Sequence, residues 1–105
     1  MKIQVNTDSN VSGNDGRAHE VEATLERILA RFEDQITRVE VHLSDENSAS
    51  KSGPPDKRCL LEVRLAGRQP VSASELAQSV DQAVTGAAHK MVRALERGLG
   101  KLGGH

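Results

Sequence analysis

The fold is decided by residues 36–43, which read ITRVEVHL. Apolar and polar side chains alternate along this stretch, and a two-residue period is typical of a strand with one buried and one exposed face. Residues 57–66, KRCLLEVRLA, repeat the alternation. The sequence therefore predicts two half-buried strands near its centre.

Two shorter strands are expected outside this pair. Residues 2–7 alternate in the same way, and residues 69–73 form a short fourth strand after the turn at Gly67 and Arg68. Pro70 suits an edge strand, because proline has no N–H to donate to a neighbour. Residues 44–56 are rich in Ser, Asn and Pro, so we expect a mobile loop there.

Two stretches have the 3.6-residue period of an amphipathic helix. The first covers residues 16–33, with Asn14 or Asp15 available as its N-cap. The second starts at Ser74 with Glu75. Its apolar positions are Leu76, Val80, Ala83, Val84, Ala87, Met91, Ala94 and Leu95.

The element order predicts an α+β fold, β-α-β-β-β-α. The first two strands are parallel because a helix crosses between them, and the other strands follow as an antiparallel meander. Each helix has one apolar stripe, so both helices pack on one face of a four-stranded mixed sheet. Residues 1–102 are expected to form a single domain, followed by a disordered tail at 103–105.

Composition limits the mode of nucleic-acid recognition. Phe32 is the only aromatic residue among 105, which excludes modules that stack bases on aromatic side chains. The net charge is −1, but residues 1–56 carry 6 basic and 11 acidic side chains, and residues 57–105 carry 8 and 4. This asymmetry favours a charged partner for one face.

No catalytic or metal-binding motif is present. Cys59 is the only cysteine, and strand alternation places it on the opposite face from His42, the nearest candidate base. The four histidines lack a second His or Cys at metal-ligand spacing. We therefore expect no enzyme activity, no cofactor and no metal. The N-terminus lacks the apolar segment of a signal peptide, which favours a cytoplasmic location.

The most informative polar feature lies on the second helix. Lys90, Arg93, Arg97 and Lys101 are spaced by 3, 4 and 4 residues, so they lie within roughly 80° of arc beside the apolar stripe. Basic residues also stabilise a helix C-terminus through its dipole, but this row is longer than a dipole requires. A cationic row without aromatic partners is typical of phosphate contacts on folded RNA. Arg68, Arg27 and Arg31 are candidates to extend it.

The chain resembles the ribosome hibernation-promoting factor family, also called ribosome-associated inhibitors. The likeness runs from Lys2 to about Leu102. It is carried by residues 36–43, 56–59 (DKRC), 66–70 (AGRQP), 80–81 (VD) and 90–95 (KMVRAL). The chain ends at His105, so it resembles the short form of the family. The family's basic helix positions fall on Lys90, Arg93, Arg97 and Lys101, while a further usual cation falls on Leu99.

The resemblance implies a monomeric protein that binds ribosomal RNA in the mRNA and tRNA channel of the small ribosomal subunit. There it would block the decoding region by steric occlusion, with no small-molecule substrate and no membrane. The alternative is a protein-interaction or regulatory module of the same fold that does not bind the ribosome. Acidic residues on the first helix motivate this alternative: Glu20, Glu22 and Glu26.

Overall fold

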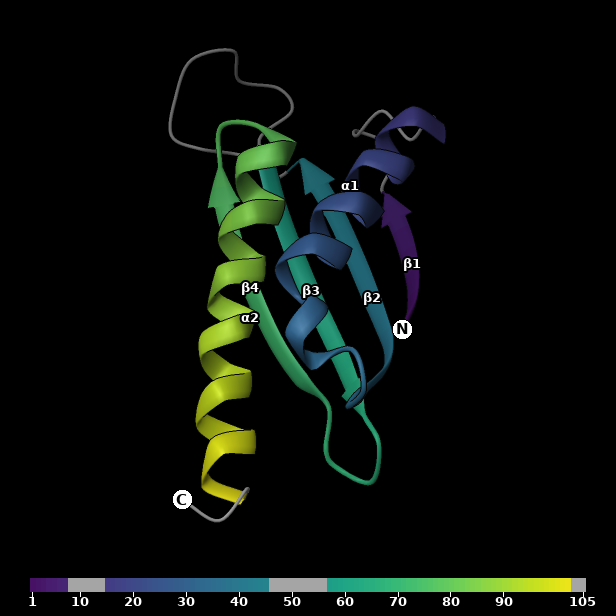
Figure 1. Ribbon diagram of the computed structural model, residues 1–105. Helices are drawn as coiled ribbons and strands as arrows, with labels where there is room; N and C mark the ends of the chain where they lie inside the picture. Colours follow the sequence, from purple (N-terminus) through teal and green to yellow (C-terminus); the bar gives the residue numbers. More distant parts are fainter. Residues whose placement is uncertain (8–14, 46–56, 103–105) are drawn as a thin grey trace.

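The computed structural model describes residues 1–7, 15–45 and 57–102. Strands and helices follow one another as the alternation and periodicity indicate (Figure 1). They are β1 (Lys2–Thr7), α1 (Asp15–Ile28), the short 3-10 helix η1 (Ala30–Phe32), β2 (Ile36–Asp45), β3 (Lys57–Leu65), β4 (Val71–Ala77) and α2 (Val80–Leu102).

The strands form one mixed sheet in the order β1-β2-β3-β4. β1 runs parallel to β2, with Ile3 opposite Val39, while β2, β3 and β4 are successive antiparallel neighbours. The helix between β1 and β2 makes the parallel pairing possible, because a tight turn would reverse the chain direction. The predicted α+β fold with a mixed four-stranded sheet is confirmed.

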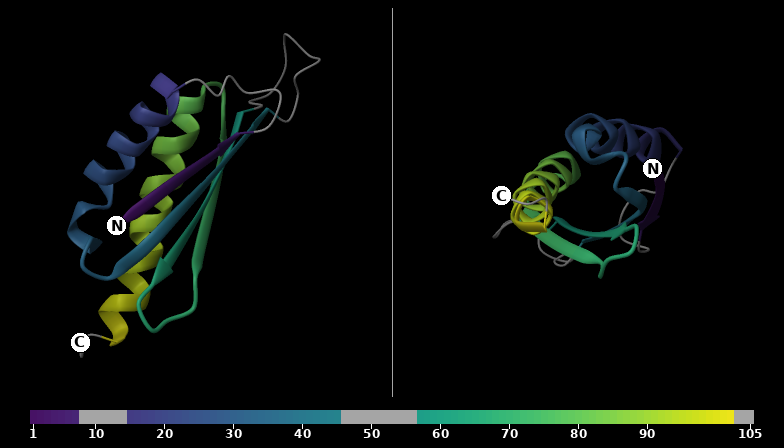
Figure 2. Two further views of the ribbon diagram at one scale, coloured as in Figure 1. Left: turned by 90° about the vertical axis from the view of Figure 1, so that its right-hand side faces the viewer. Right: turned by 60° about the horizontal axis from the view of Figure 1, so that its bottom comes forward.

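Both helices pack on the same face of the sheet, which we call the covered face (Figure 2). Alternate strand residues project into this layer, and most of them are 0% exposed. The buried strand residues are Ile36, Val39, Val41, Leu43, Cys59, Leu61, Val63 and Leu65. Leu25 of α1 and Met91 of α2, both 0% exposed, close the core from above. Burial of each large apolar side chain contributes about 1.5–3 kcal/mol relative to exposure.

The second helix starts later than the sequence pattern predicts. Ser74 and Glu75 belong to β4, whose pairing with β3 continues to Ala77 opposite Lys57. The expected start at Ser74 is therefore wrong, because a continuous ladder with β3 outweighs a local capping signal. Leu76, assigned to the helix stripe, instead lies 52% exposed on β4.

Ser79 provides the N-terminal cap of α2. Its hydroxyl Oγ accepts a hydrogen bond from the backbone N–H of Gln82 at 3.1 Å, and its carbonyl oxygen accepts the N–H of Ala83 at 3.0 Å. A side-chain oxygen on one of the first free N–H groups is the usual stabilising contact at a helix start. The true boundary thus uses the same capping chemistry as the predicted one, five residues further along the chain.

The first helix is shorter than the expected 16–33. It ends at Ile28, and the chain tightens into η1, where the Phe32 N–H donates to the Leu29 carbonyl at 2.9 Å. This tighter turn brings Phe32 into the core at 6% exposure. The expected loop at 44–56 also starts later, because Ser44 and Asp45 lie in β2.

Two expectations from the sequence concern residues outside those that the structure describes. One is the expected mobile loop, whose residues 46–56 lie outside β2. The other is the expected disordered tail at residues 103–105. Asn14, one of the two proposed caps of α1, also lies outside the described residues.

Candidate nucleic-acid interface

One flank of α2 carries Lys90, Arg93 and Arg97, which we call the basic ridge. All three are exposed, while Met91 and Leu95 on the neighbouring face of the helix are 0% and 1% exposed. The ridge follows from the sequence spacing, since three- and four-residue steps return to the same side of a helix. Lys101 continues the spacing within α2, but its side chain lies outside the described residues.

The contacts of Lys90 show on which side of the molecule the basic ridge lies. Its ammonium Nζ lies 2.7 Å from the Glu75 Oε1 atom and donates to the Ser74 carbonyl oxygen at 3.1 Å. Both partners are on β4, so the ridge runs along the β4 side of the molecule. A Cβ at Gly86 would meet Glu75 Cγ at 2.7 Å. The absence of a side chain at Gly86 thus makes room for the Glu75 carboxylate beside α2.

Arg93 and Arg97 differ from Lys90 because no acid of the described residues pairs with them. Within the described residues, no ion pair or hydrogen bond engages either guanidinium. A guanidinium that remains charged at every physiological pH and has no internal partner is available to an external phosphate or carboxylate. These two arginines are the strongest candidate contacts of the ridge.

Arg68 lies close to the C-terminal half of α2. It lines a hollow of about 690 Å³ together with Ala94, Leu95 and Gly98. The residue belongs to the β3–β4 turn, where Gly67 adopts a φ of 70°. A positive φ suits glycine, which has no Cβ to clash. The turn thus brings Arg68 to the same end of α2 as Arg97.

Arg27 and Arg31 are placed on the α1 side of the molecule. Arg31 Nη1 lies 2.8 Å from Glu96 Oε2 on α2, and its guanidinium sits 4.8 Å from the Phe32 ring centroid. Arg27 is exposed on α1. Glu96 lies about 100° around α2 from Arg97 by helical geometry, on the side that faces Arg31 of α1. The structure therefore joins Arg68 to the ridge and sets Arg27 and Arg31 apart from it.

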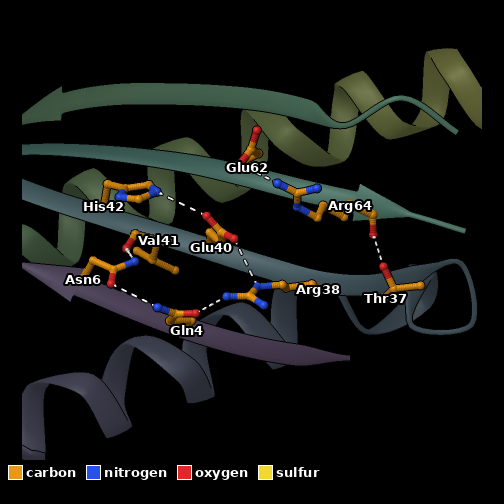
Figure 3. Close-up of polar contacts among 9 residues, drawn as sticks. All are labelled: Gln4, Asn6, Thr37, Arg38, Glu40, Val41, His42, Glu62 and Arg64. Carbon is orange, nitrogen blue, oxygen red and sulfur yellow. Dashed lines mark hydrogen bonds and ion pairs between the residues drawn. The ribbon is translucent and has the colours of Figure 1, made fainter.

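The face of the sheet away from the helices, the open sheet face, carries charges that neutralise one another (Figure 3). Register places Glu40 opposite Glu62 and Arg38 opposite Arg64, and like charges in these positions are destabilising. Each glutamate is offset by an arginine on its own strand: Arg38 Nε lies 3.1 Å from Glu40, and Arg64 Nη2 lies 3.9 Å from Glu62. This face offers few free cations to a partner.

Further polar contacts tie β1 to this face. Arg38 donates to Gln4 Oε1, Gln4 donates to Asn6 Oδ1 at 3.3 Å, and Asn6 donates to the Val41 carbonyl oxygen at 3.4 Å. These contacts link residues 34 and 35 positions apart in the chain. The open sheet face therefore reinforces the strand pairing.

The other candidate groups stay separate, as the sequence predicts. Cys59 is fully buried on the covered face, where desolvation raises the pKa of its thiol from 9.0 to about 12. His42 is exposed on the opposite face. Within the described ranges, no three His, Cys, Asp or Glu side chains gather as metal ligands. No described helix has the length and apolar character that a membrane crossing needs.

Sequence reasoning missed the role of Glu75. The residue was assigned to the start of a helix, which would have placed it well before Lys90 on the same element. Its partner Lys90 becomes visible only once β4 is known to continue to Ala77 and to run beside α2. A signal was present in the alternation of residues 71–77, where Val71, Ala73 and Glu75 share one face.

Comparisons with known proteins agree with this architecture. A sequence model of the family described as Sigma 54 modulation protein / S30EA ribosomal protein matches residues 3–102. Among solved structures, the N-terminal domain of Protein Y from Thermus thermophilus superposes with a TM-score of 0.71 at 24% identity, covering 92% of this chain and 98% of that one. A ribosomal subunit interface protein from Coxiella burnetii gives 0.73 at 20% identity, with 92% and 96% coverage. No curated protein sequence matches significantly.

Proposed function

Because this chain belongs to the Sigma 54 modulation protein / S30EA ribosomal protein family, a family of ribosome-associated modulation and hibernation factors, we propose that it binds the small ribosomal subunit and inhibits translation. Membership in this family confirms the resemblance found from the sequence. The name of the Coxiella burnetii relative, a ribosomal subunit interface protein, supports the same partner. The protein acts in the cytoplasm as a monomer, through a single domain at 1–102.

The observation that carries the proposal is that two arginines of the basic ridge have no ion pair or hydrogen bond among the described residues. Arg93 and Arg97 contact phosphates of ribosomal RNA, with Lys90, Lys101 and Arg68 continuing the contact along α2 and the adjacent turn. Arg27 and Arg31 contact RNA from a separate side of the protein, next to α1. Phosphate contacts of this kind position a protein on folded RNA without reading its bases.

The mechanism is steric occlusion without catalysis. The protein lies in the mRNA and tRNA channel and covers the decoding region, so neither ligand can enter while it is bound. No chemical step is required of any residue. The paired charges of the open sheet face and the buried thiol of Cys59 accordingly have structural roles.

The decisive experiment is sucrose-gradient sedimentation of the tagged protein in a stationary-phase lysate at low and high salt. We expect co-sedimentation with small subunits that weakens steeply as salt rises, because phosphate contacts release counterions. A variant with Lys90, Arg93, Arg97 and Lys101 all changed to glutamate should not co-sediment. Unchanged binding of that variant would overturn the site, and absence of wild-type binding at low salt would overturn the function.

The second candidate is a protein-interaction module, favoured by the acidic outer side of α1. Glu20 and Glu26 are exposed there, next to the half-buried Glu22. A pull-down that recovers a defined protein partner and no ribosomal RNA would support this candidate. Recovery of ribosomal RNA that disappears in the quadruple glutamate variant would exclude it.

A further inference from the structure

A hollow lies between the β3–β4 turn and the C-terminal half of α2, and the phosphate contacts proposed above leave it unused. Its volume of about 690 Å³ lies within the roughly 300–1,000 Å³ range of ligand sites. Leu65, Val71 and Leu95 provide apolar lining, and Arg68 and Gln69 contribute polar side chains from the turn. An apolar lining with a few polar side chains is typical of sites that bind small organic groups.

Gly98 gives an independent indication that the hollow is kept open. It lies inside α2 and lines the hollow, and a Cβ built there would meet no atom within 4 Å. Glycine within a helix costs about 0.5–1 kcal/mol relative to alanine. Gly86 has a packing reason, the nearby Glu75, but nothing in the described structure requires glycine at position 98. The space over Gly98 is free for close approach of a ligand.

The charged residues around the hollow indicate whether a bound group would be positively or negatively charged. Arg68 is part of its lining, and Arg97, without a partner in the described part of the chain, precedes Gly98. None of the described lining residues is acidic. The acid next to Arg97 in α2, Glu96, has its carboxylate 2.8 Å from Arg31 of α1. An occupant with an apolar body and adjoining negative charge therefore fits best.

We propose that this hollow receives one unstacked nucleobase of the bound RNA, while its flanking phosphates contact Arg68 and Arg97. Single-stranded bases in folded RNA are commonly splayed out and stacked on arginine guanidinium planes as well as on aromatic rings. Arg68 supplies such a plane in a chain with only one aromatic residue, and the Gln69 amide supplies hydrogen bonds to a base edge. This inference rests on the proposed function and adds one base contact to a phosphate-based interface.

The test fills the hollow without removing charge. Gly98→Leu places a side chain in the space that is open above the helix, and Gly98→Ala is the matched control that leaves most of it free. Gln82→Leu adds the same leucine to another exposed position of α2, away from the hollow. Thermal unfolding followed by circular dichroism verifies that all three variants fold.

Affinity for purified small ribosomal subunits is then measured across a salt series. Gly98→Leu should weaken binding by roughly five- to a hundredfold, the range of one stacked base. The salt slope should stay unchanged, because no phosphate contact is lost. Gln82→Leu should bind like the wild type, and Gly98→Ala should weaken binding less than Gly98→Leu. Wild-type affinity in Gly98→Leu would overturn the base site while leaving the proposed function intact.

Chemical probing of ribosomal RNA bases in the complexes identifies the occupant. The wild-type complex should change the reactivity of one base, and the Gly98→Leu complex should lose that change while retaining the remaining footprint. A fall in affinity with identical base reactivity in both complexes would mean that a protein side chain fills the hollow, and would overturn the inference. Failure of the wild type to bind small subunits would remove the proposed function and this inference together.

Discussion

The covered face and the open sheet face differ most clearly at two successive residues of β3. Leu61 is 0% exposed beneath the helices, whereas Leu60 is half-buried on the other side of the same strand. The buried residues of the covered face are all apolar, whereas the open sheet face carries Arg–Glu pairs along β2 and β3. The difference teaches where an anionic partner can bind. On the open sheet face Arg38 and Arg64 are paired with glutamates, whereas Arg93 and Arg97 on the flank of α2 have no ion pair within the described residues.

The largest expected effect tests the two faces directly. Leu61→Ala removes a fully buried side chain and should lower the free energy of unfolding by about 2–5 kcal/mol, because it leaves a cavity. Leu60→Ala makes the same chemical change one residue away and should cost less than about 1 kcal/mol. Urea denaturation followed by circular dichroism measures both values. Equal losses would show that the open sheet face is buried by another part of the protein.

The second prediction compares charge on the two polar surfaces. Arg93→Glu with Arg97→Glu should weaken binding to small subunits by roughly a hundredfold and flatten the salt slope by about 1.8, since two phosphate contacts are lost. Arg38→Glu with Arg64→Glu introduces the same charge change on the open sheet face, where both arginines have acidic partners. This control should change affinity by less than about threefold. Comparable losses of affinity in the two double variants would show that the open sheet face is part of the interface.

The third prediction concerns the thiol on the covered face. Because the pKa of folded Cys59 is about 12 and its ordinary value is 9.0, the unfolded chain loses its proton first as pH rises. The contribution of the protonated thiol to the free energy of unfolding is therefore fully present below pH 9. It is lost between pH 9 and 12, by about 1.4 kcal/mol per pH unit. Urea unfolding at pH 8 and pH 10 should show a larger loss for the wild type than for Cys59→Ala. An equal loss of unfolding free energy between pH 8 and pH 10 in the two proteins would contradict burial of the thiol.

The smallest effect is expected from the partly neutralised end of the basic ridge. Glu75→Gln removes the carboxylate that lies 2.7 Å from Lys90, which frees the ammonium for phosphate. Affinity for small subunits should rise by about threefold and the salt slope should steepen by up to about 0.9. Glu96→Gln removes the same charge on the side of α2 that faces Arg31 and should have a smaller effect on both. A fall in affinity for Glu75→Gln would mean that Glu75 positions Lys90 instead of competing for it.

The sequence predicts the parts of this molecule that depend on local periodicity. Alternation in residues 36–43 and 57–66 places Cys59 and His42 on opposite faces, as observed, and helical spacing brings Lys90, Arg93 and Arg97 to one flank. Contacts between elements distant in sequence are beyond such patterns. The extension of β4 to Ala77 depends on pairing with β3, and the Glu75–Lys90 contact follows from that extension.

The sequence predicts which charged residues could form the candidate site, but it does not predict the shape of the surface around them. Residue spacing identifies the cations of α2. It does not separate Arg93 and Arg97, which have no partner in the described part of the chain, from Lys90 and Arg31, which have acidic partners. The hollow is likewise invisible in the sequence, because its lining combines a turn, a strand and a helix. Arg68 was a candidate from its charge alone, and its closeness to Gly98 comes from the tertiary packing.

The parallel pairing of β1 has a consequence for the order of folding. β2, β3 and β4 are consecutive antiparallel neighbours, whereas β1 pairs only with β2, from which it is separated in the chain by α1 and η1. Closing a longer loop costs more chain entropy, and non-local pairings form more slowly. We therefore expect β1 to dock last on a preformed β2–β3–β4–α2 unit, and its amides to exchange hydrogen first in the native state.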